Sequence, residues 1–305
     1  EAEISTKRAI EINPDLVIAH SNLSVIYRDR ENLAEAESSI RKAINLNSNM
    51  ANLHCILGGI MKDLGKIIEA EVSTLKSLSI NPNLIDAITN LAGIYDAQGK
   101  TEKAFNTYYK AMQVSKDNIK ICTLTTQFLE NNFQFKFEKS NLKVLLNILF
   151  DREDINHRPL FILLNYLYSE ICLPIHSNKE NILREHNVAQ LISDKLLIKA
   201  MKKIILRDSR WENFFTKIRK SLINNIELGY NKFNTLEYQF LVALSEQCFL
   251  NEYVYYISKE EKHSIKNIIN RCNRGEMDLI TIVFLSCYFP MYELLDKIPS
   301  IDLFK

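Results

Sequence analysis

The sequence predicts an all-α protein in which a helical repeat solenoid is followed by a second all-helical domain. Two observations indicate this fold class. Small and apolar residues recur with a period of 34 residues over the first 118 residues, and beyond residue 118 the period stops while the apolar residues keep helical spacing. Self-similarity at such a period is typical of solenoids, in which each repeat packs mainly on its neighbours.

The repeats come first along the chain. Three full copies occupy 17–50, 51–84 and 85–118, and a half copy precedes them at 1–16. The half copy "AEISTKRAIEINPDL" aligns with "AEVSTLKSLSINPNL" from the second half of a later copy. Three sites recur in each full copy. The first holds Leu23, Leu57 and Leu91, the second holds Ala36, Ala70 and Ala104, and the third holds Tyr27, Met61 and Tyr95. Period, small-residue sites and terminal Asn-Pro together resemble the tetratricopeptide repeat, TPR.

The chemistry of these sites predicts a helix-turn-helix unit. Gly65 and Gly99 can take the left-handed conformation that ends the first helix of a copy. The alanines stand where a larger side chain would push the second helix off the first. Pro14 and Pro82 mark boundaries between units, because proline suits the start of a helix and not its interior. His20 and His54 occupy a site that often holds Trp in TPR sequences, so we expect a structural role for both.

The resemblance to TPR proteins implies a concave groove, lined by the first helix of each copy, that takes extended or helical peptides. In repeats resembling those of O-linked GlcNAc transferases, an Asn just before the repeat Leu clamps a peptide backbone. The equivalent residues here are Asn22, Ile56 and Asn90, so the middle position has lost its amide. The candidate peptide-binding residues are Asn22, Asn90, Arg28, Asp29, Lys62, Asp63 and Asp96. The alternative is that both asparagines are merely solvated.

Residues 119–305 predict the second domain, which has only two glycines, Gly229 and Gly275. Helices are expected near 119–131, 139–150, 158–172, 190–206, 210–226, 235–250, 260–272 and 277–288. Capping boxes are predicted for the pairs Ser209 and Glu212, Ser258 and Glu261, and Asn234 and Glu237. The only strand-like alternation is the short "QFKF" at 134–137.

Composition narrows the possible functions. A net charge of +1 provides no overall electrostatic field to attract nucleic acid or acidic membranes. The sequence contains no run of about 18 apolar residues, so no membrane span is expected. Six cysteines without a CxxC pair predict buried, reduced thiols and no zinc site. The same cysteine usage predicts a cytoplasmic location. The chain starts inside a repeat helix, without an initiator Met, a basic start or an apolar signal core, so we expect a piece of a longer protein or missing first residues.

No motif for catalysis or cofactor binding is found. Glycine-rich phosphate loops, a GxSxG elbow and HExxH are absent from the sequence, so we assign no catalytic, cofactor or metal-binding residue. The densest basic segment, 195–220, surrounds Trp211, the only tryptophan. Nucleic-acid binding by cations and stacking is one interpretation. The preferred one is the solvated face of two packed helices.

A second resemblance concerns three segments of the helical domain. "RWENFFTKIRKSLI" at 210–223, "FLVALSEQCFLNEYVYYIS" at 240–258 and "LSCYFPMYELL" at 285–295 resemble a region of bacterial TPR-containing class I S-adenosylmethionine-dependent methyltransferases. There the region links repeats to a catalytic domain with a glycine-rich cofactor loop, which is absent from this sequence. Glu246, Gln247, Asn251 and Glu252 lie among apolar residues and would need partners if buried.

Two functions follow from these observations. The first is the substrate-recruiting and regulatory front part of a methyltransferase, which by itself binds no S-adenosylmethionine. The alternative is a stand-alone TPR adaptor for proteins or peptides. An independently active enzyme ranks third.

Overall fold

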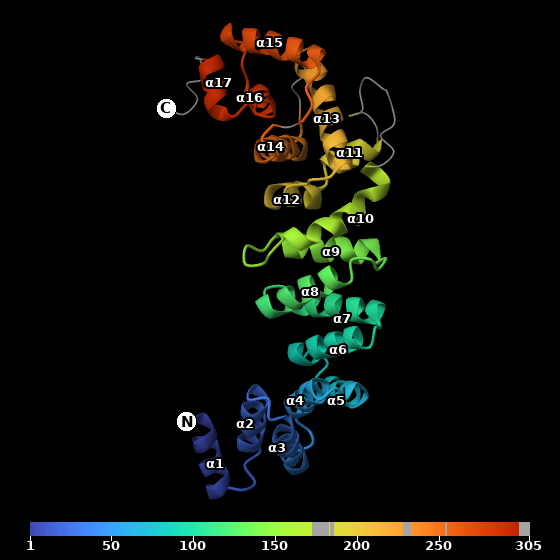
Figure 1. Ribbon diagram of the computed structural model, residues 1–305, viewed down its shortest axis with the longest axis vertical. Helices are drawn as coiled ribbons and strands as arrows, with labels where there is room; N and C mark the ends of the chain where they lie inside the picture. The colour runs from blue at the N-terminus through green and yellow to red at the C-terminus, as the bar shows by residue number, and fades with distance from the viewer. Residues whose placement is uncertain (173–182, 184–185, 228–232, 254, 299–305) are drawn as a thin grey trace. The chain divides into compact units, whose positions relative to one another are not determined.

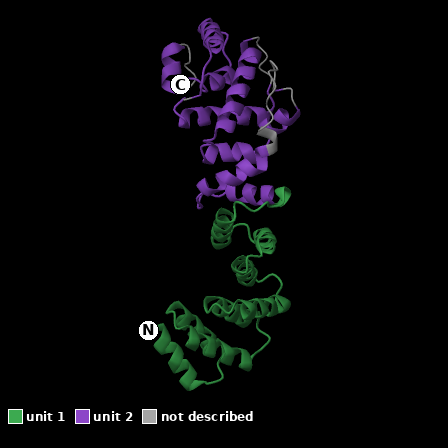
Figure 2. Ribbon diagram, turned by 45° about the vertical axis from the view of Figure 1, so that its right-hand side comes forward, with its two compact units in different colours: residues 1–141 green, residues 142–305 purple. Residues whose placement is uncertain are grey.

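The structure is a computed structural model that describes residues 1–172, 183, 186–227, 233–253 and 255–298. Within these residues the chain forms 17 α-helices and one short 3-10 helix, and no β-strand (Figure 1). The predicted all-α class is confirmed. The chain divides into two compact units, Glu1–Asn141 and Leu142–Lys305 (Figure 2).

The first unit begins with the repeats. Its helices are α1 (Ala2–Ile12), α2 (Val17–Asp29), α3 (Leu33–Leu46), α4 (Ala51–Asp63), α5 (Ile67–Ile80), α6 (Ile85–Ala97), α7 (Thr101–Val114) and α8 (Ile119–Asn131). Each full copy supplies one antiparallel pair: α2 with α3, α4 with α5, and α6 with α7. Each pair also packs on the next one along the chain, as a solenoid requires.

A left-handed residue ends the turn after each first helix. Gly65 has φ 73° and Gly99 has φ 69°, as the sequence predicts. In the first copy the equivalent residue is Glu31, at φ 59°. A side chain disfavours this conformation, so the first turn is formed with a less suitable residue than the other two.

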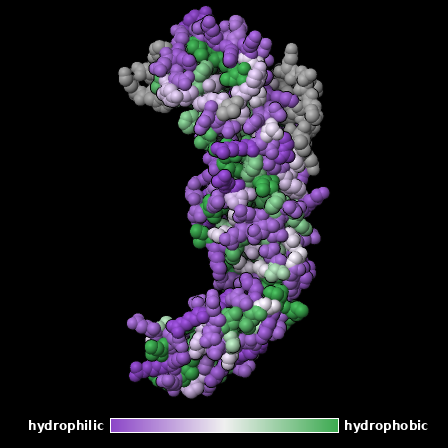
Figure 3. All heavy atoms as spheres, viewed as in Figure 1, coloured by the Kyte–Doolittle hydropathy of each residue, from purple (hydrophilic) through white to green (hydrophobic). Residues whose placement is uncertain are grey.

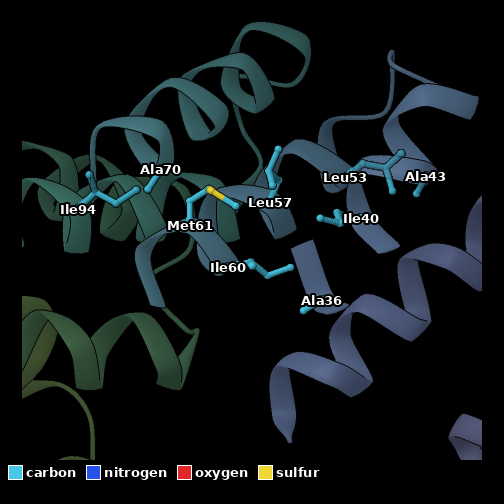
Figure 4. Close-up of a cluster of buried hydrophobic side chains, with 9 residues drawn as sticks. All are labelled: Ala36, Ile40, Ala43, Leu53, Leu57, Ile60, Met61, Ala70 and Ile94. Carbon is cyan, nitrogen blue, oxygen red and sulfur yellow. The ribbon is translucent and has the colours of Figure 1, made fainter. Parts of the chain in front are cut away.

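Alanines control the approach of the paired helices. Figure 4 shows the central cluster of buried side chains, which consists of Ala36, Ile40, Ala43, Leu53, Leu57, Ile60, Met61, Ala70 and Ile94. Ala36, Ala70 and Ala104 are fully buried. A Cβ at Gly58 of α4 would lie 2.2 Å from Oγ1 of Thr74 and 3.3 Å from the carbonyl oxygen of Ala70. The two helices of the middle copy therefore touch over atoms no larger than a methyl group.

Two histidines form hydrogen bonds with the backbone that precedes their helices. The Nε2 atom of His20 lies 2.8 Å from the carbonyl oxygen of Pro14, and that of His54 lies 2.9 Å from the carbonyl oxygen of Ser48. Because a carbonyl oxygen only accepts hydrogen bonds, Nε2 carries the hydrogen in both rings. This is the structural role expected for both residues.

Beyond the repeats, the first unit continues through α8 and a loop. The side chain of Asn118 accepts a hydrogen bond from the Lys120 amide and caps α8. The segment 134–137, which alternates like a strand, forms a turn and loop. Phe137 in this loop packs on Phe105 of α7, with ring centroids 4.7 Å apart. The loop is thus part of the core of this unit.

The second unit is formed by shorter helices. They are α9 (Lys139–Phe150, of which the unit takes the part from Leu142), η1 (Arg158–Leu160), α10 (Phe161–Cys172), α11 (His186–Ile192), α12 (Lys195–Lys203), α13 (Ser209–Glu227), α14 (Thr235–Leu250), α15 (Lys259–Asn273), α16 (Leu279–Leu285) and α17 (Met291–Lys297).

Several boundaries differ from the sequence prediction. The helix expected at 190–206 is divided into α11 and α12, because the Asp194 side chain accepts the Leu196 amide and starts a new helix. The helix expected at 277–288 ends at Leu285, and α17 was not predicted. The capping boxes of α14 and α15 are confirmed. The Ser209 box is wrong, since Ser209 is already helical and Asp208 accepts the Arg210 amide.

Candidate peptide-binding face

The first helices of the repeats carry all the residues predicted to bind a peptide. Helix α4 contacts both α2 and α6, so these three helices form one continuous surface, which we call the α2–α4–α6 face. Asn22 and Asp29 are seven residues apart and lie on the same side of α2. Ile56 and Asp63 are their equivalents on α4.

An ion pair joins α2 to α4 on this face. The Nε atom of Arg28 lies 2.6 Å from Oδ2 of Asp63, and each side chain is 33% exposed. Gly59 makes room for the guanidinium, because a Cβ at that residue would lie 2.8 Å from Nη1 of Arg28. Arg28 and Asp63 thus remain accessible while they hold each other in place.

Lys62 is the equivalent of Arg28 in the next copy, and it lies against a glycine of the following first helix in the same way. Its Nζ atom would lie 3.5 Å from a Cβ at Gly93 of α6, an ordinary contact distance. Gly59 and Gly93 are equivalent positions, 34 residues apart. A cation of one first helix therefore reaches the glycine of the next one, at two successive steps of the array.

The two predicted asparagines differ in their surroundings. Asn22 is exposed. Asn90 is half-buried, and its Nδ2 atom donates to the carbonyl oxygen of Cys55 at 3.4 Å. The Sγ atom of Cys55 lies 3.5 Å from the same nitrogen. Burial raises the pKa of the Cys55 thiol to about 11. The side-chain amide of Asn22 is available to a ligand, whereas the amide nitrogen of Asn90 already donates a hydrogen bond inside the repeats.

The remaining predicted residues are two carboxylates. Asp29 is exposed at the end of α2. Oδ1 of Asp96 accepts a hydrogen bond of 3.1 Å from Nδ2 of Asn132, the residue that ends α8. The structure thus joins Arg28 to Asp63, places Lys62 against α6, and couples Asp96 to Asn132 at the end of α8.

The sequence did not predict roles on this side of the array for Gly59, Gly93 or Cys55, nor a further ion pair. Nζ of Lys120 lies 3.5 Å from Oδ1 of Asp86, and both side chains are strongly exposed. These contacts between successive first helices join residues 34 to 36 positions apart. The repeat period was a signal from which such partners could have been found.

The described residues contain no cluster typical of a metal site. Among them, no three His, Cys, Asp or Glu side chains gather where they could hold an ion. Five cysteines are buried and form no disulfide among the described residues, namely Cys55, Cys122, Cys248, Cys272 and Cys287. The side chain of Cys172 and all of His176 lie outside the described residues. No described helix is both long and apolar enough to span a bilayer.

The polar residues of the 240–258 segment have separate environments. Gln247 is fully buried, and its Nε2 atom donates to the carbonyl oxygens of Met201 at 2.5 Å and Ile204 at 2.8 Å. Its Oε1 atom accepts the Leu206 amide at 3.0 Å. Glu246 and Glu252 are exposed. Gln247 therefore satisfies the backbone where α12 ends, a structural role.

A buried polar cluster connects α13, α15 and Tyr288, which follows α16. Arg219 and Glu261 are 2% and 3% exposed, with Nε 3.5 Å from Oε1. The Tyr288 hydroxyl donates to the same Oε1 atom at 3.1 Å, and Arg219 lies over its ring at 4.4 Å. Burial raises the pKa of Tyr288, so the hydroxyl stays protonated. Glu261 also accepts the Ser258 amide in its capping box.

The basic segment 195–220 has few features of a nucleic-acid surface. Trp211 is buried and donates from Nε1 to Oδ1 of Asn165 at 2.6 Å, so its ring offers no exposed face for stacking. Lys199 pairs with Asp151 at 2.6 Å. Most of the segment matches the preferred prediction of packed helices with a solvated face, but Arg219 is inside the core. In the view of Figure 3, hydrophilic residues cover most of the surface between small hydrophobic groups.

The comparison with protein families agrees with the repeat assignment. The family described as "Tetratricopeptide repeat" matches residues 18–50 and 85–118. No curated protein matches the sequence. Solved structures with a similar fold include pilF of Pseudomonas aeruginosa, with 15% identity, 69% of this chain and 86% of that chain covered, and a TM-score of 0.46.

Two further structures are similar to this chain. YrrB, described as a TPR protein with an unusual peptide-binding site, has 16% identity over 65% of this chain and 91% of its own, with a TM-score of 0.45. Human IFIT1 has 12% identity over 97% of this chain and 65% of its own, with a TM-score of 0.40. The family match, together with the helix pairs at the same residues, shows that residues 18–50 and 85–118 form tetratricopeptide repeats.

Proposed function

We propose that this protein is a scaffold whose α2–α4–α6 face binds an extended segment of a partner protein. The observations that support this most directly are the accessible Arg28–Asp63 pair and the exposed Asn22 on α2. An amide can donate and accept at once, which suits the alternating N–H and C=O groups of an extended backbone. TPR domains bind peptides and proteins, and this face has the polar groups for such binding.

The charges of the face favour a partner segment with both signs of charge. Arg28 and Lys62 can attract carboxylates, and Asp29 and Asp63 can attract ammonium or guanidinium groups. Asn90 and Asp96 contribute less, because Cys55 and Asn132 already use part of their hydrogen-bonding capacity. We therefore place the centre of binding on α2 and α4.

Peptide selection on the full chain tests this proposal. Phage-displayed peptides selected on the wild type should bind Asn22→Ala about tenfold more weakly, because one hydrogen-bonding amide is lost. Asn106→Ala is the matched control, since Asn106 is exposed on α7, a second helix of a repeat. Circular dichroism would verify that both variants fold. Failure to select any peptide, or equal affinities for the two variants, would contradict the proposal.

The predicted link to methyl transfer remains a prediction and is not our main proposal. Neither the family match nor the similar structures concern methyl transfer, and the adaptor alternative explains the repeats without it. The bacterial origin that this resemblance implies and the cytoplasmic location expected from the sequence are also still predictions. Calorimetry with S-adenosylmethionine would test the associated expectation that residues 1–305 do not bind it.

A further inference from the structure

A second candidate site lies in the second unit, apart from the α2–α4–α6 face. A cavity of about 740 Å³ opens between the segment Ile155–Ile162, which contains η1 and the start of α10, and the segment Lys203–Arg207, which leads from the end of α12 toward α13. Cavities of about 300–1,000 Å³ are the usual size of small-molecule sites. We call this cavity the basic pocket.

The charges of the basic pocket all have one sign. Arg158, Lys203 and Arg207 line it, and none of the lining residues that the structure describes is a carboxylate. Lys203 pairs with Glu153, which is mostly exposed and is not part of the lining. Arg158 and Arg207 form no side-chain ion pair or hydrogen bond with any residue that the structure describes. Two guanidinium groups are therefore available for an anion, which they can bind through paired hydrogen bonds.

The rest of the lining is mainly apolar. Ile155, Phe161 and Ile205 are half-buried around the cavity, and Ile162 is 45% exposed. Burying such surface against a ligand is favourable, but it gives no preference for charge. A bare inorganic anion would leave these side chains uncovered. The lining thus suits a ligand with an apolar body and a single anionic group.

The pocket walls are held in place without a ligand. His157 is buried, its ring stacks on Phe150 with centroids 5.2 Å apart, and its Nε2 atom lies 3.0 Å from the carbonyl oxygen of Leu149. The Asn156 side chain accepts the Arg158 amide at 3.1 Å. On the other wall, Gln247 holds the backbone at Ile204 and Leu206. Fixed walls reduce the ordering cost of binding.

We propose that the basic pocket binds a small organic anion, in which a carboxylate, sulfonate or phosphate contacts Arg158 and Arg207 and an aromatic or aliphatic body covers Phe161 and Ile205. This site is independent of the peptide-binding face. It would give the scaffold a small-molecule ligand in addition to a protein partner.

A pair of fluorescent probes tests this proposal on the full chain. Anilinonaphthalene sulfonate is an aromatic anion, and phenylnaphthylamine is a neutral compound of nearly the same shape. The double variant Arg158→Gln plus Arg207→Gln should bind the sulfonate at least about tenfold more weakly, because charged hydrogen bonds are lost. It should bind the neutral amine as the wild type does. Ile162→Ser should weaken binding of both probes.

Matched controls separate the basic pocket from other surfaces. Lys262→Gln plus Arg274→Gln removes two exposed cations elsewhere in the same unit and should change neither affinity. A second cavity of about 480 Å³, lined by Phe249, Leu250 and Met291, could also take an apolar dye, but the arginine substitutions would not affect it. No sulfonate binding to the wild type, equal loss of both probes, or equal effects of the two double variants would overturn the proposal.

Discussion

At the scale of single residues, methyl-sized groups determine how closely the repeat helices pack. Ala70 is fully buried, and its carbonyl oxygen lies against Gly58 of the paired helix. A larger side chain at residue 70 has no free volume to enter, so it must displace α5 from α4. The same reasoning applies to Ala36 and Ala104, which are equally buried.

The first prediction is that Ala70→Leu lowers the free energy of unfolding by about 1–3 kcal/mol. Urea denaturation followed by circular dichroism measures it. Ala97→Leu is the control, because Ala97 is exposed at the end of α6 and should tolerate the change. Equal stabilities of the two variants would show that the register of the repeats is wrong.

The second prediction concerns the Cys55 thiol, which burial keeps protonated. With a pKa of about 11, about one thiol in a thousand is ionised at pH 8, so iodoacetamide should alkylate Cys55 at least about 100-fold more slowly than a free cysteine peptide. Mass spectrometry of the Cys55 peptide gives the rate. In urea the rate should rise to that of the free peptide. A native rate within tenfold of the peptide rate would contradict this account.

The same pKa makes stability depend on pH in a defined direction. Unfolding exposes the thiol and returns its pKa from about 11 toward 9.0. Below pH 9 both states hold the proton and the contribution is constant. Between about 9 and about 11 only the folded state holds it, so the Cys55 contribution to the free energy of unfolding decreases as pH rises.

The role of a residue was predictable from the sequence wherever an equivalent residue recurs in another copy of the repeat. Gly65, Gly99 and the three alanines could be assigned because each has an equivalent one copy away. The partners of Asn90 and Asp96 could not, because a sequence gives the composition of a surface but not which hydrogen bonds its side chains already make. Arg158 and Arg207 are 49 positions apart, and no spacing rule brings them into one pocket.

At the scale of elements, caps and buried polar groups fix where helices begin and how they connect. The asparagine and serine boxes of α14 and α15 were predictable, because they depend on residues three positions apart. The division between α11 and α12 was missed because both helices share one apolar pattern and only the cap at Asp194 separates them. Short α17 was missed because its seven residues are too few to show a period.

The third prediction concerns the buried cluster that joins α13, α15 and Tyr288. Glu261→Gln should lower the free energy of unfolding by about 3 kcal/mol, because it leaves the Arg219 charge buried without its counter-ion. Glu260→Gln changes the same kind of side chain at the exposed neighbouring position and should leave the free energy of unfolding nearly unchanged. Urea denaturation compares the two variants. Equal losses would mean that the ion pair contributes little.

At the scale of the whole molecule, the chain contains two compact units with separate cores. The sequence predicts a change of architecture at residue 118, whereas the first compact unit extends to Asn141. Phe137 explains the difference, because it packs on Phe105 and so ties the loop after α8 to the last repeat. A non-repetitive segment gives no periodic signal from which such an attachment could be predicted.

The fourth prediction is that the two units unfold in separate calorimetric transitions. Ala70→Leu should lower the midpoint of one transition, and Glu261→Gln should lower the midpoint of the other, because each residue lies in the core of a different unit. The unaffected transition in each variant is the internal control. A single transition that both substitutions shift equally would show that the units unfold together.

The left-handed Glu31 has a consequence for how the array moves. A side chain in this conformation costs about 1–2 kcal/mol that glycine would not. The turn between α2 and α3 should therefore open transiently more often than the turns at Gly65 and Gly99, with faster amide hydrogen exchange. Asn22 and Arg28 belong to the helix that this turn ends. Binding of a partner would have to suppress this transient opening, and the free-energy cost of doing so would weaken the observed affinity.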